Sequence, residues 1–141
     1  MEQIERSYGI IPLKDEGSEI KIFLVKLASG HHWGFPKGHS EKDEMPKECA
    51  KRELFEETQL KVVSFLPRDS LKEEYTLTRD GKIVKKIVEL FPAYVEGNAA
   101  IQTGEILEGD WFDISLAKEL LTYDASRQVL KKLLENLPNK N

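Results

Sequence analysis

Three glutamates in the middle of the chain constrain what it can fold into. Glu53, Glu56 and Glu57 stand at positions i, i+3 and i+4, so on a helix they share one face about one turn long. Carboxylates this close repel one another, and a hard divalent cation with oxygen ligands would offset the repulsion. The alternative is an acidic helix face that points into solvent, as most runs of charged residues do.

Such a cluster suits one kind of metal ion. Mg²⁺ is held by a few carboxylates and completed by water and phosphate oxygens, and Mn²⁺ accepts similar ligands. Arg52 adjoins the carboxylates in sequence, and its planar guanidinium can hold a carboxylate in a fixed orientation. We therefore predict a Mg²⁺ site on this helix, with Mn²⁺ as a substitute.

The spacing around the cluster resembles the Nudix box, G-x5-E-x7-R-E-U-x-E-E-x-G-U, in which U is aliphatic. Gly38 is followed by five residues and Glu44, then by seven residues and the run 52–57. Every specified position agrees except Gln59, where the family has glycine. The residue after a helix often takes the left-handed conformation, which costs a non-glycine residue roughly 1 kcal/mol. We predict a small loss of stability and intact chemistry.

The resemblance implies a fold and a chemistry. The fold is α+β, an α/β/α Nudix sandwich with a mixed β-sheet and a loop–helix–loop catalytic motif. The chemistry is hydrolysis of a nucleoside diphosphate linked to another moiety. Glu56 is the first candidate for the general base, while Arg52 and Glu44 have orienting roles. The groups implied to bind the metal are Glu53, Glu56, Glu57, Glu105 and the carbonyl of Gly38.

Flanking residues are similar to one branch of the family. The stretch HHWGFPKGH (31–39) is similar to H-W-x-x-P-K-G-H in the asymmetrical diadenosine tetraphosphate hydrolases. Lys37 stands where enzymes that clean oxidised nucleoside triphosphates usually have glycine and RNA 5′-pyrophosphohydrolases usually have glutamine. An ammonium group beside a metal site can neutralise a polyphosphate chain. The alternative is a loop lysine that faces solvent.

Further positions match the same branch. The resemblance implies that Lys86 and His32 contact phosphate and that Tyr75 and Tyr123 sandwich adenine. Stacking between two rings tolerates different bases and contributes about 1–3 kcal/mol per base. For each tyrosine alone, an aromatic at the core or its rim is an equally good interpretation.

Hydrophobic periodicity predicts the order of the elements. Strands are expected at 7–13, 19–28, 61–66, 71–78, 83–96 and 111–112, with a glycine-rich loop over 29–39. Helices are expected at 46–58, 116–121 and 125–137. Asp124 is the predicted N-cap of the last helix and Pro138 its end. This order favours a layered α/β sandwich with a mixed sheet.

Composition bounds the remaining functions. The 141 residues are expected to form one domain (1–141). A net charge of −4 does not suggest a nucleic-acid coat or a polybasic membrane binder. The lone cysteine, Cys49, cannot form an internal disulfide, and no signal peptide or membrane span is visible. We expect a cytoplasmic monomer or weak dimer with no stable nucleic-acid or membrane partner.

The predicted activity is Mg²⁺-dependent hydrolysis of diadenosine tetraphosphate and related dinucleoside polyphosphates to ATP and AMP. An RNA 5′-pyrophosphohydrolase or another nucleoside polyphosphate pyrophosphatase is the alternative among enzymes. A nucleotide-binding regulator without turnover is the alternative from another class. That class tends to lose box glutamates, and all four are present in this chain.

Overall fold

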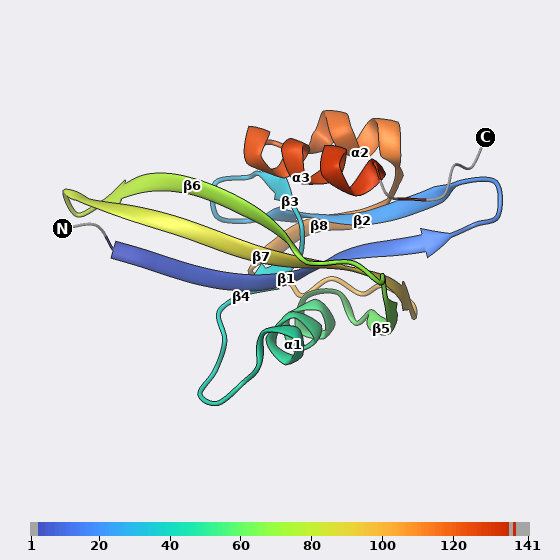
Figure 1. The fold of residues 1–141 in the computed structure, drawn as a ribbon, viewed down its shortest axis with the longest axis horizontal. Helices are drawn as coiled ribbons and strands as arrows, with labels where there is room; N and C mark the ends of the chain where they lie inside the picture. The colour runs from blue at the N-terminus through green and yellow to red at the C-terminus, as the bar shows by residue number, and fades with distance from the viewer. Residues whose placement is uncertain (1–2, 136, 138–141) are drawn as a thin grey trace.

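A β-sheet with helices on its faces makes up the fold (Figure 1). The computed structural model describes residues 3–135 and 137. Its strands are β1 (Gln3–Asp15), β2 (Ile20–Leu27), β3 (Trp33–Gly34), β4 (Lys37–Gly38), β5 (Lys61–Phe65), β6 (Leu71–Arg79), β7 (Lys82–Glu96) and β8 (Ile106–Asp113). Its helices are α1 (Pro46–Thr58), α2 (Ile114–Leu120) and α3 (Asp124–Leu134).

The first strand of the chain lies in the middle of the sheet. The main order is β3-β2-β1-β7-β5, and β4, β6 and β8 pair with β1, β7 and β2. β1 and β7 run parallel, from the pair Gln3↔Val84 to the pair Leu13↔Tyr94. The other pairings are antiparallel. The sheet is therefore mixed, as the sequence predicts.

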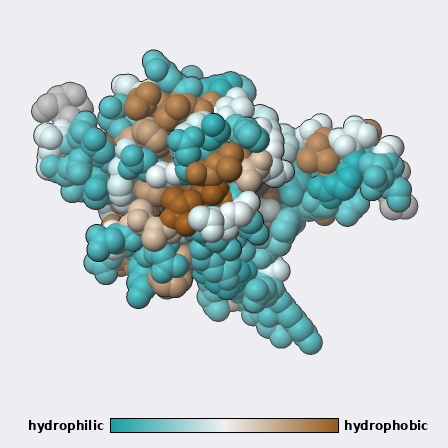
Figure 2. Space-filling model, turned by 180° about the vertical axis from the view of Figure 1, so that it is seen from behind, coloured by the Kyte–Doolittle hydropathy of each residue, from teal (hydrophilic) through white to brown (hydrophobic). Residues whose placement is uncertain are grey.

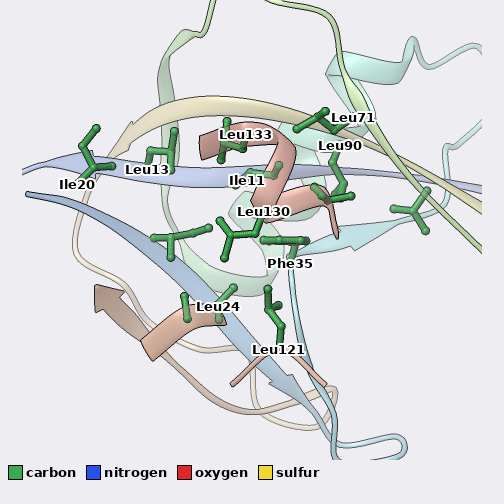
Figure 3. Packing of buried hydrophobic residues seen from close by; sticks show 14 residues of the cluster. Ile11, Leu13, Ile20, Leu24, Phe35, Leu71, Leu90, Leu121, Leu130 and Leu133 are labelled. Carbon is green, nitrogen blue, oxygen red and sulfur yellow. The ribbon is translucent and has the colours of Figure 1, made fainter. Parts of the chain in front are cut away.

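Helices cover both faces of this sheet. α2 and α3 lie over one face and α1 over the other (Figure 1). Under α2 and α3, Leu24, Leu121 and Leu130 belong to the buried cluster drawn in Figure 3. Under α1, Phe23 and Leu54 belong to a second cluster. β2 supplies both clusters because successive side chains of a strand point to opposite faces.

Several strands are longer than the sequence pattern predicts. β1 begins at Gln3 rather than at residue 7, and β8 begins at Ile106 rather than at Trp111. The added residues are mostly exposed, but their backbones pair with β7 and β2. The expected loop over 29–39 contains β3 and β4, which pair with β2 and β1. Backbone pairing, to which hydrophobic periodicity is blind, extends these strands and fixes the segment that precedes α1.

The last helix differs from its prediction at both ends. α3 has Tyr123 as its N-cap, so the prediction of Asp124 as the N-cap is wrong. Asp124 lies instead in the first turn, where its negative charge interacts favourably with the positive end of the helix dipole. The helix ends at Leu134, earlier than expected, although Leu137 still packs against the core. Pro138, the predicted end, lies outside the described residues.

The buried face of α1 is not wholly apolar. Cys49 and Leu54 are fully buried, whereas Phe55 is 39% exposed. Glu57 and Thr58 are buried as well. They lie three and four residues after Leu54, on the same side of the helix. The carboxylate of Glu57, one of the three in the acidic cluster, is therefore buried.

The surface of the molecule is mixed. Seen from behind, apolar side chains gather toward the middle of the molecule, the projecting hairpin carries an apolar patch among polar side chains, and the projecting loop is polar (Figure 2). In the part of the chain that the structure describes, no helix has the length and apolar character needed to cross a membrane.

Candidate active site

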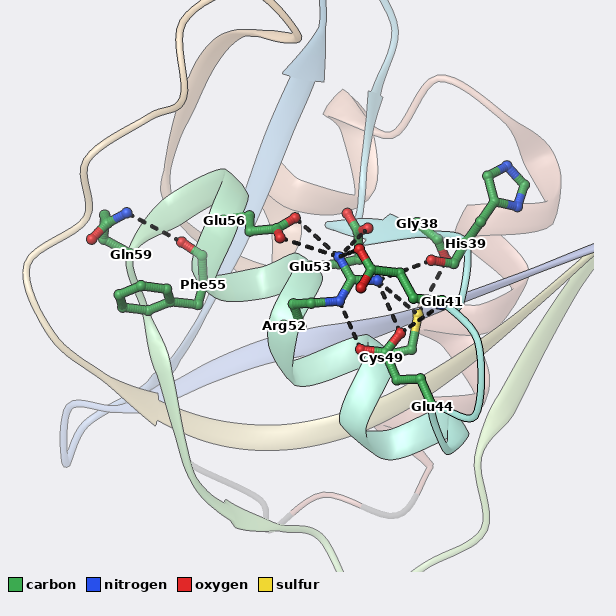
Figure 4. A network of polar contacts seen from close by, with 10 residues as sticks. All are labelled: Gly38, His39, Glu41, Glu44, Cys49, Arg52, Glu53, Phe55, Glu56 and Gln59. Atoms are coloured by element: carbon green, nitrogen blue, oxygen red, sulfur yellow. Dashed lines mark hydrogen bonds and ion pairs between the residues drawn. The ribbon is translucent and has the colours of Figure 1, made fainter.

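One arginine organises the acidic face of α1 (Figure 4). Arg52 donates from Nε to Glu44 Oε2 at 2.7 Å and from Nη2 to Glu44 Oε1 at 3.0 Å. Its Nη1 group donates to Glu53 Oε1 at 3.0 Å and to Glu56 Oε2 at 3.1 Å. Nη2 also donates to the carbonyl of His39 at 3.0 Å. One guanidinium thus holds three of the carboxylates that the sequence singles out.

Glu44 connects this network to the loop before α1. The hydrogen bonds from Arg52, followed by the one from the backbone N–H of Glu41, lower the pKa of Glu44 to about 2. The same pair raises the pKa of Arg52. Both groups are therefore charged at neutral pH, and the two-pronged contact is the geometry expected of an orienting pair.

Glu57 lies inside the protein, away from Arg52. It is 3% exposed, and its carboxylate accepts a hydrogen bond from the backbone N–H of Lys37. Its Oε2 atom has no hydrogen-bond partner among residues 3–135 and 137. Burial, and next the charge of Glu53, raises the pKa of Glu57 to about 8. A buried carboxylate of this kind calls for a cation or a proton to compensate its charge.

Gly38 allows Glu53 to approach strand β4 closely. A side-chain carbon at position 38 would overlap the Glu53 carboxylate. The Gly38 carbonyl accepts a hydrogen bond from the Cys49 thiol at 3.6 Å. Burial raises the pKa of this thiol to about 12, so it stays protonated and can donate. Glycine at position 38 is therefore needed for the carboxylate and the carbonyl to lie together.

An open polar cleft runs beside these groups. Glu105 lies on it. Burial is the main cause of the raised pKa values of Glu53 and Glu57, and the charge of Glu105 adds to it. No set of three or more His, Cys, Asp or Glu side chains in the described chain already forms a metal-binding group. The reason is that Glu53 and Glu56 are turned onto Arg52. The predicted site residues that line the cleft are Lys37, Gly38, Arg52, Glu53, Lys86 and Glu105.

Lys86 reaches the cleft with its charge already paired. Its ammonium lies 3.1 Å from Glu5 Oε1, and Arg79 lies 2.6 Å from the other oxygen of the same carboxylate. The hydrogen bonds from Arg79 and Lys86 lower the pKa of Glu5. A phosphate at Lys86 would therefore compete with Glu5.

A second pocket shares Lys37 with the cleft. Tyr75 on β6 and Tyr123 before α3 have ring planes 16° apart and ring centroids 6.2 Å apart. His32 lies against Tyr123, with ring centroids 4.9 Å apart. Burial, and then the charge of Lys37, lowers the pKa of His32. The structure brings the two predicted base-stacking tyrosines together and places His32 with them.

Two polar residues that the sequence analysis did not single out also line this pocket. Glu73 on β6 is 4% exposed and Ser126 on α3 is 5% exposed. The Ser126 side chain hydrogen-bonds to the Glu73 carboxylate. Glu73 lies on the same face of β6 as Leu71 and Tyr75, because strand side chains alternate. An acidic residue at an inward position of this alternation is the sequence signal that could have identified it.

Lys37 is the residue common to both pockets. Its backbone is fixed by pairing of β4 with β1, at Gly9↔Lys37. Its ammonium forms no ion pair within the described part of the chain. Burial lowers its pKa, whereas the charges of Glu73 and Glu57 act in the opposite direction. A partly buried cation without a close ion-pair partner among the described residues favours an anionic ligand.

Gln59 ends α1 in the left-handed conformation, with φ 66° and ψ 6°. Its backbone N–H donates to the Phe55 carbonyl at 2.8 Å, and its side-chain amide donates to the same oxygen at 3.4 Å. The residue thus adopts the conformation typical of glycine at this point, and its side chain adds a contact that glycine lacks.

A protein-family comparison accounts for most of the chain. The family model described as the NUDIX domain matches residues 4–133. The chain belongs to the Nudix family. The resemblance inferred from the Nudix box at 38–60 is confirmed.

Other known proteins resemble the chain over different lengths. The m7GpppN-mRNA hydrolase dcap-2 of Caenorhabditis elegans is 31% identical over 109 residues, which are 77% of this chain and 13% of that protein. This chain therefore spans only a small part of that relative. The C. elegans Ap4A hydrolase binary complex has a TM-score of 0.71 at 19% identity, covering 92% of this chain and 95% of that one. The NUDIX domain of Shewanella oneidensis NrtR, complexed with ADP ribose, has a TM-score of 0.77 at 15% identity, covering 96% and 89%. At these identities, the two structures establish the Nudix fold.

Nudix proteins generally use a divalent metal, and the residues present here fit one. The available donors are carboxylates and a backbone carbonyl, the hard oxygen ligands that Mg²⁺ prefers. Glu57 offers a buried oxygen without a partner in the described residues. Glu53 and the backbone of Gly38 lie against each other, and Glu105 lines the same cleft. Glu53 and Glu56 would exchange Arg52 for the cation.

Proposed function

We propose that this protein hydrolyses dinucleoside polyphosphates in a Mg²⁺-dependent reaction and splits diadenosine tetraphosphate asymmetrically into ATP and AMP. Lys37 carries the proposal, because it lines both the acidic cleft and the aromatic pocket. A base attached to a polyphosphate chain needs two such environments side by side. Aromatic rings hold the base, and a positive charge leads the phosphates toward the carboxylates.

The acidic cleft is the place for the reacting phosphates. Mg²⁺ bound there would supply Lewis-acid chemistry and lower the pKa of a water molecule. Lys37 and Lys86 would offset the negative charge of the phosphates. Glu44 would hold Arg52 beside the carboxylates that take the ion. The groups that would hold the ion are Glu53, Glu56, Glu57, Glu105 and the Gly38 carbonyl.

The reaction we propose is an in-line displacement at phosphorus. The water oxygen forms a bond to one phosphorus, and the bond from that phosphorus to the bridging oxygen breaks, which leaves ATP and AMP. A carboxylate takes the proton from the water. Glu56 is our first choice, because its side chain is 49% exposed and can meet water, whereas Glu57 is 3% exposed.

The aromatic pocket is the place for one adenine. A base between two rings needs about 3.4 Å on either side, the stacking distance in nucleic acids. The centroids of Tyr75 and Tyr123 are 6.2 Å apart, so a small movement of either ring would admit a base. His32, which packs on Tyr123, would border the base and the first phosphate.

Hydrolysis of an RNA 5′ end is the second candidate. The 31% identity to an m7GpppN-mRNA hydrolase favours it, because a cap is also a base joined to a nucleotide through phosphates. The net charge of −4 disfavours a long RNA substrate, since most RNA-binding surfaces are basic. A nucleotide-binding regulator without turnover is disfavoured by the complete set of box carboxylates.

One chromatographic assay separates these activities. The full chain with Mg²⁺ would be incubated with diadenosine tetraphosphate, ATP, 5′-triphosphate RNA and capped RNA, and the products would be resolved. We expect ATP and AMP in equal amounts from the first substrate and slow reaction with the others. Faster reaction of either RNA would replace the proposal with the RNA activity, and no reaction with any substrate would favour a regulator.

A further inference from the structure

Glu73 is a buried carboxylate that the proposed reaction does not use. It is 4% exposed and lines the aromatic pocket with Tyr75 and Tyr123. Its Oε2 atom finds no hydrogen-bond partner within residues 3–135 and 137. Native proteins rarely leave a buried carboxylate oxygen without a donor. On the wall of a pocket, such an oxygen is available to accept a hydrogen bond from a bound ligand.

The surroundings of Glu73 fix its direction. It stands two residues before Tyr75 on the same face of β6, where Glu73 pairs with Val88 and Tyr75 with Lys86. Ser126, three residues after Tyr123, hydrogen-bonds to the carboxylate from α3. Each of the two walls thus contributes one ring and one polar group.

Glu73 offers an acceptor oxygen to the pocket whether or not its carboxyl group is ionised. Burial raises the pKa of the carboxyl group, while the hydrogen bond from Ser126 and the charge of Lys37 oppose that effect. A carboxyl group keeps acceptor capacity in both its charged and its neutral form, and Oε2 of Glu73 has no donor among the described residues. The complementary ligand group is therefore an N–H donor on the edge of the stacked base.

We propose that Glu73 reads the base held between Tyr75 and Tyr123, with its free Oε2 atom accepting a hydrogen bond from the exocyclic amino group of adenine. This inference rests on the proposed function, because it assumes that the pocket holds a base. The two rings would stack on any base, whereas Glu73 selects bases that carry an N–H group on the inner edge. Guanine also carries such groups and would be accepted, whereas purine without a substituent would not.

The test compares two ligands that differ by one amino group. AMP and purine riboside 5′-monophosphate have the same ring system, sugar and phosphate, but only AMP carries the exocyclic amine. The full chain would be titrated with each in the presence of a chelator and followed by NMR, so the readout is binding without turnover. We expect AMP to bind about 10- to 100-fold more tightly, the range for a hydrogen bond to a charged group.

Glu73→Met tests the residue itself. Methionine keeps the length of the side chain and removes both the charge and the acceptor, so the preference for AMP should vanish while purine riboside 5′-monophosphate binds as before. Glu74→Met is the matched control, because Glu74 is the exposed neighbour on β6. Its preference should equal that of the wild type. The wild-type comparison stands even if Glu73→Met does not fold.

Two results would overturn the inference. Equal affinities of the wild type for the two ligands would show that nothing reads the amine. An equal loss for both ligands in Glu73→Met would show that Glu73 acts on the charge of Lys37 instead. Failure of the proposed function is distinguishable, because a wild type that prefers AMP but hydrolyses no dinucleoside polyphosphate keeps the base site and loses only the reaction.

Discussion

The acidic cleft and the aromatic pocket are assembled from the chain in opposite ways. Most carboxylates of the cleft come from residues 38–57, one short strand, one loop and one helix, and three of them are gathered on Arg52. The walls of the pocket come from 32–37, 73–75 and 123–126. The last two segments meet because α3 packs on β6, and hydrogen bonds between Trp33 and Thr122 join the first segment to the third. The acidic cleft is thus a local structure, and the aromatic pocket depends on tertiary packing. Substitutions should therefore be able to impair hydrolysis without base binding, or base binding without hydrolysis.

The largest expected effect on activity comes from a substitution in the acidic cleft. Glu57→Gln should lower kcat with diadenosine tetraphosphate by orders of magnitude and leave the fold intact, because the amide is a poor ligand for a hard cation. Chelation of divalent ions should abolish wild-type activity. Turnover and circular dichroism would be measured on the same samples.

Glu48→Gln is the control, since Glu48 is an exposed residue on the same helix. Unchanged turnover in Glu57→Gln, together with activity in the presence of the chelator, would show that the acidic face is only solvated surface.

Lys37 lines both the cleft and the pocket, and its replacement should have the next largest effect on activity. Lys37→Ala should lower kcat/KM by about 10²- to 10³-fold, the range for loss of one group that stabilises transition-state charge. Thermal melting should change little, because no ion pair of Lys37 is lost in the described part of the chain.

Lys86→Ala sharpens the contrast. It should lower kcat/KM less and Tm more, because Lys86 is buried and already paired with Glu5. Wild-type activity with a lowered Tm in both variants would show that both lysines are structural.

The stacking tyrosines test the tertiary region. Tyr75→Ala or Tyr123→Ala should raise KM by about 5- to 150-fold, equivalent to about 1–3 kcal/mol of lost stacking, with a smaller change in kcat. Tyr75→Phe and Tyr123→Phe keep the ring and should be nearly harmless.

Stability should divide the two alanine variants. Tyr123 is 49% exposed, so Tyr123→Ala should melt like the wild type. Tyr75 packs against the core, so Tyr75→Ala should lower Tm. An unchanged KM in all four variants, measured beside Tm, would end the adenine-stacking proposal.

The smallest effect concerns the pH dependence of the Arg52 network. The pKa of Glu44 is lowered from 4.5 to about 2, so its contribution to stability is full above pH 4.5 and is lost as pH falls toward 2. Glu44→Gln should therefore lower Tm at pH 7, and the difference from the wild type should shrink in acid.

Glu41→Gln is the matched control, because the Glu41 side chain is 72% exposed and lies 3.8 Å from the same guanidinium. Its Tm should follow the wild type. A difference in Tm for Glu44→Gln that stays constant between pH 7 and pH 3 would contradict the ion-pair explanation.

The same contrast explains what the sequence could predict. The face shared by Glu53, Glu56 and Glu57 follows from helical spacing, and α1 forms at the predicted residues 46–58. The contact between Tyr75 and Tyr123 depends on packing across the sheet, and only the family resemblance suggested it. Glu73 was missed because the alternation of β6 marks its position only as inward, and one inward acidic residue does not by itself indicate a chemical role.

The sequence pattern also failed to predict the lengths of some strands, for a related reason. The first residues of β1 are exposed and lack a hydrophobic pattern, yet Gln3 pairs with Val84. Periodicity records which side chains are buried, whereas the length of a strand depends on where its neighbour's backbone lies.

The central place of β1 also bears on how the chain is made. Gln3 pairs with Val84 and Leu13 with Tyr94, so the partners are separated by most of the length of the protein. A ribosome adds about 5–20 residues per second, so β1 leaves the exit tunnel several seconds before its parallel partner. Over that interval its buried face, with Ile11 and Leu13, has no β7 to cover it. Long-range parallel pairing is intrinsically slow, and β1 is therefore the segment in which nascent chains should be most prone to associate with one another.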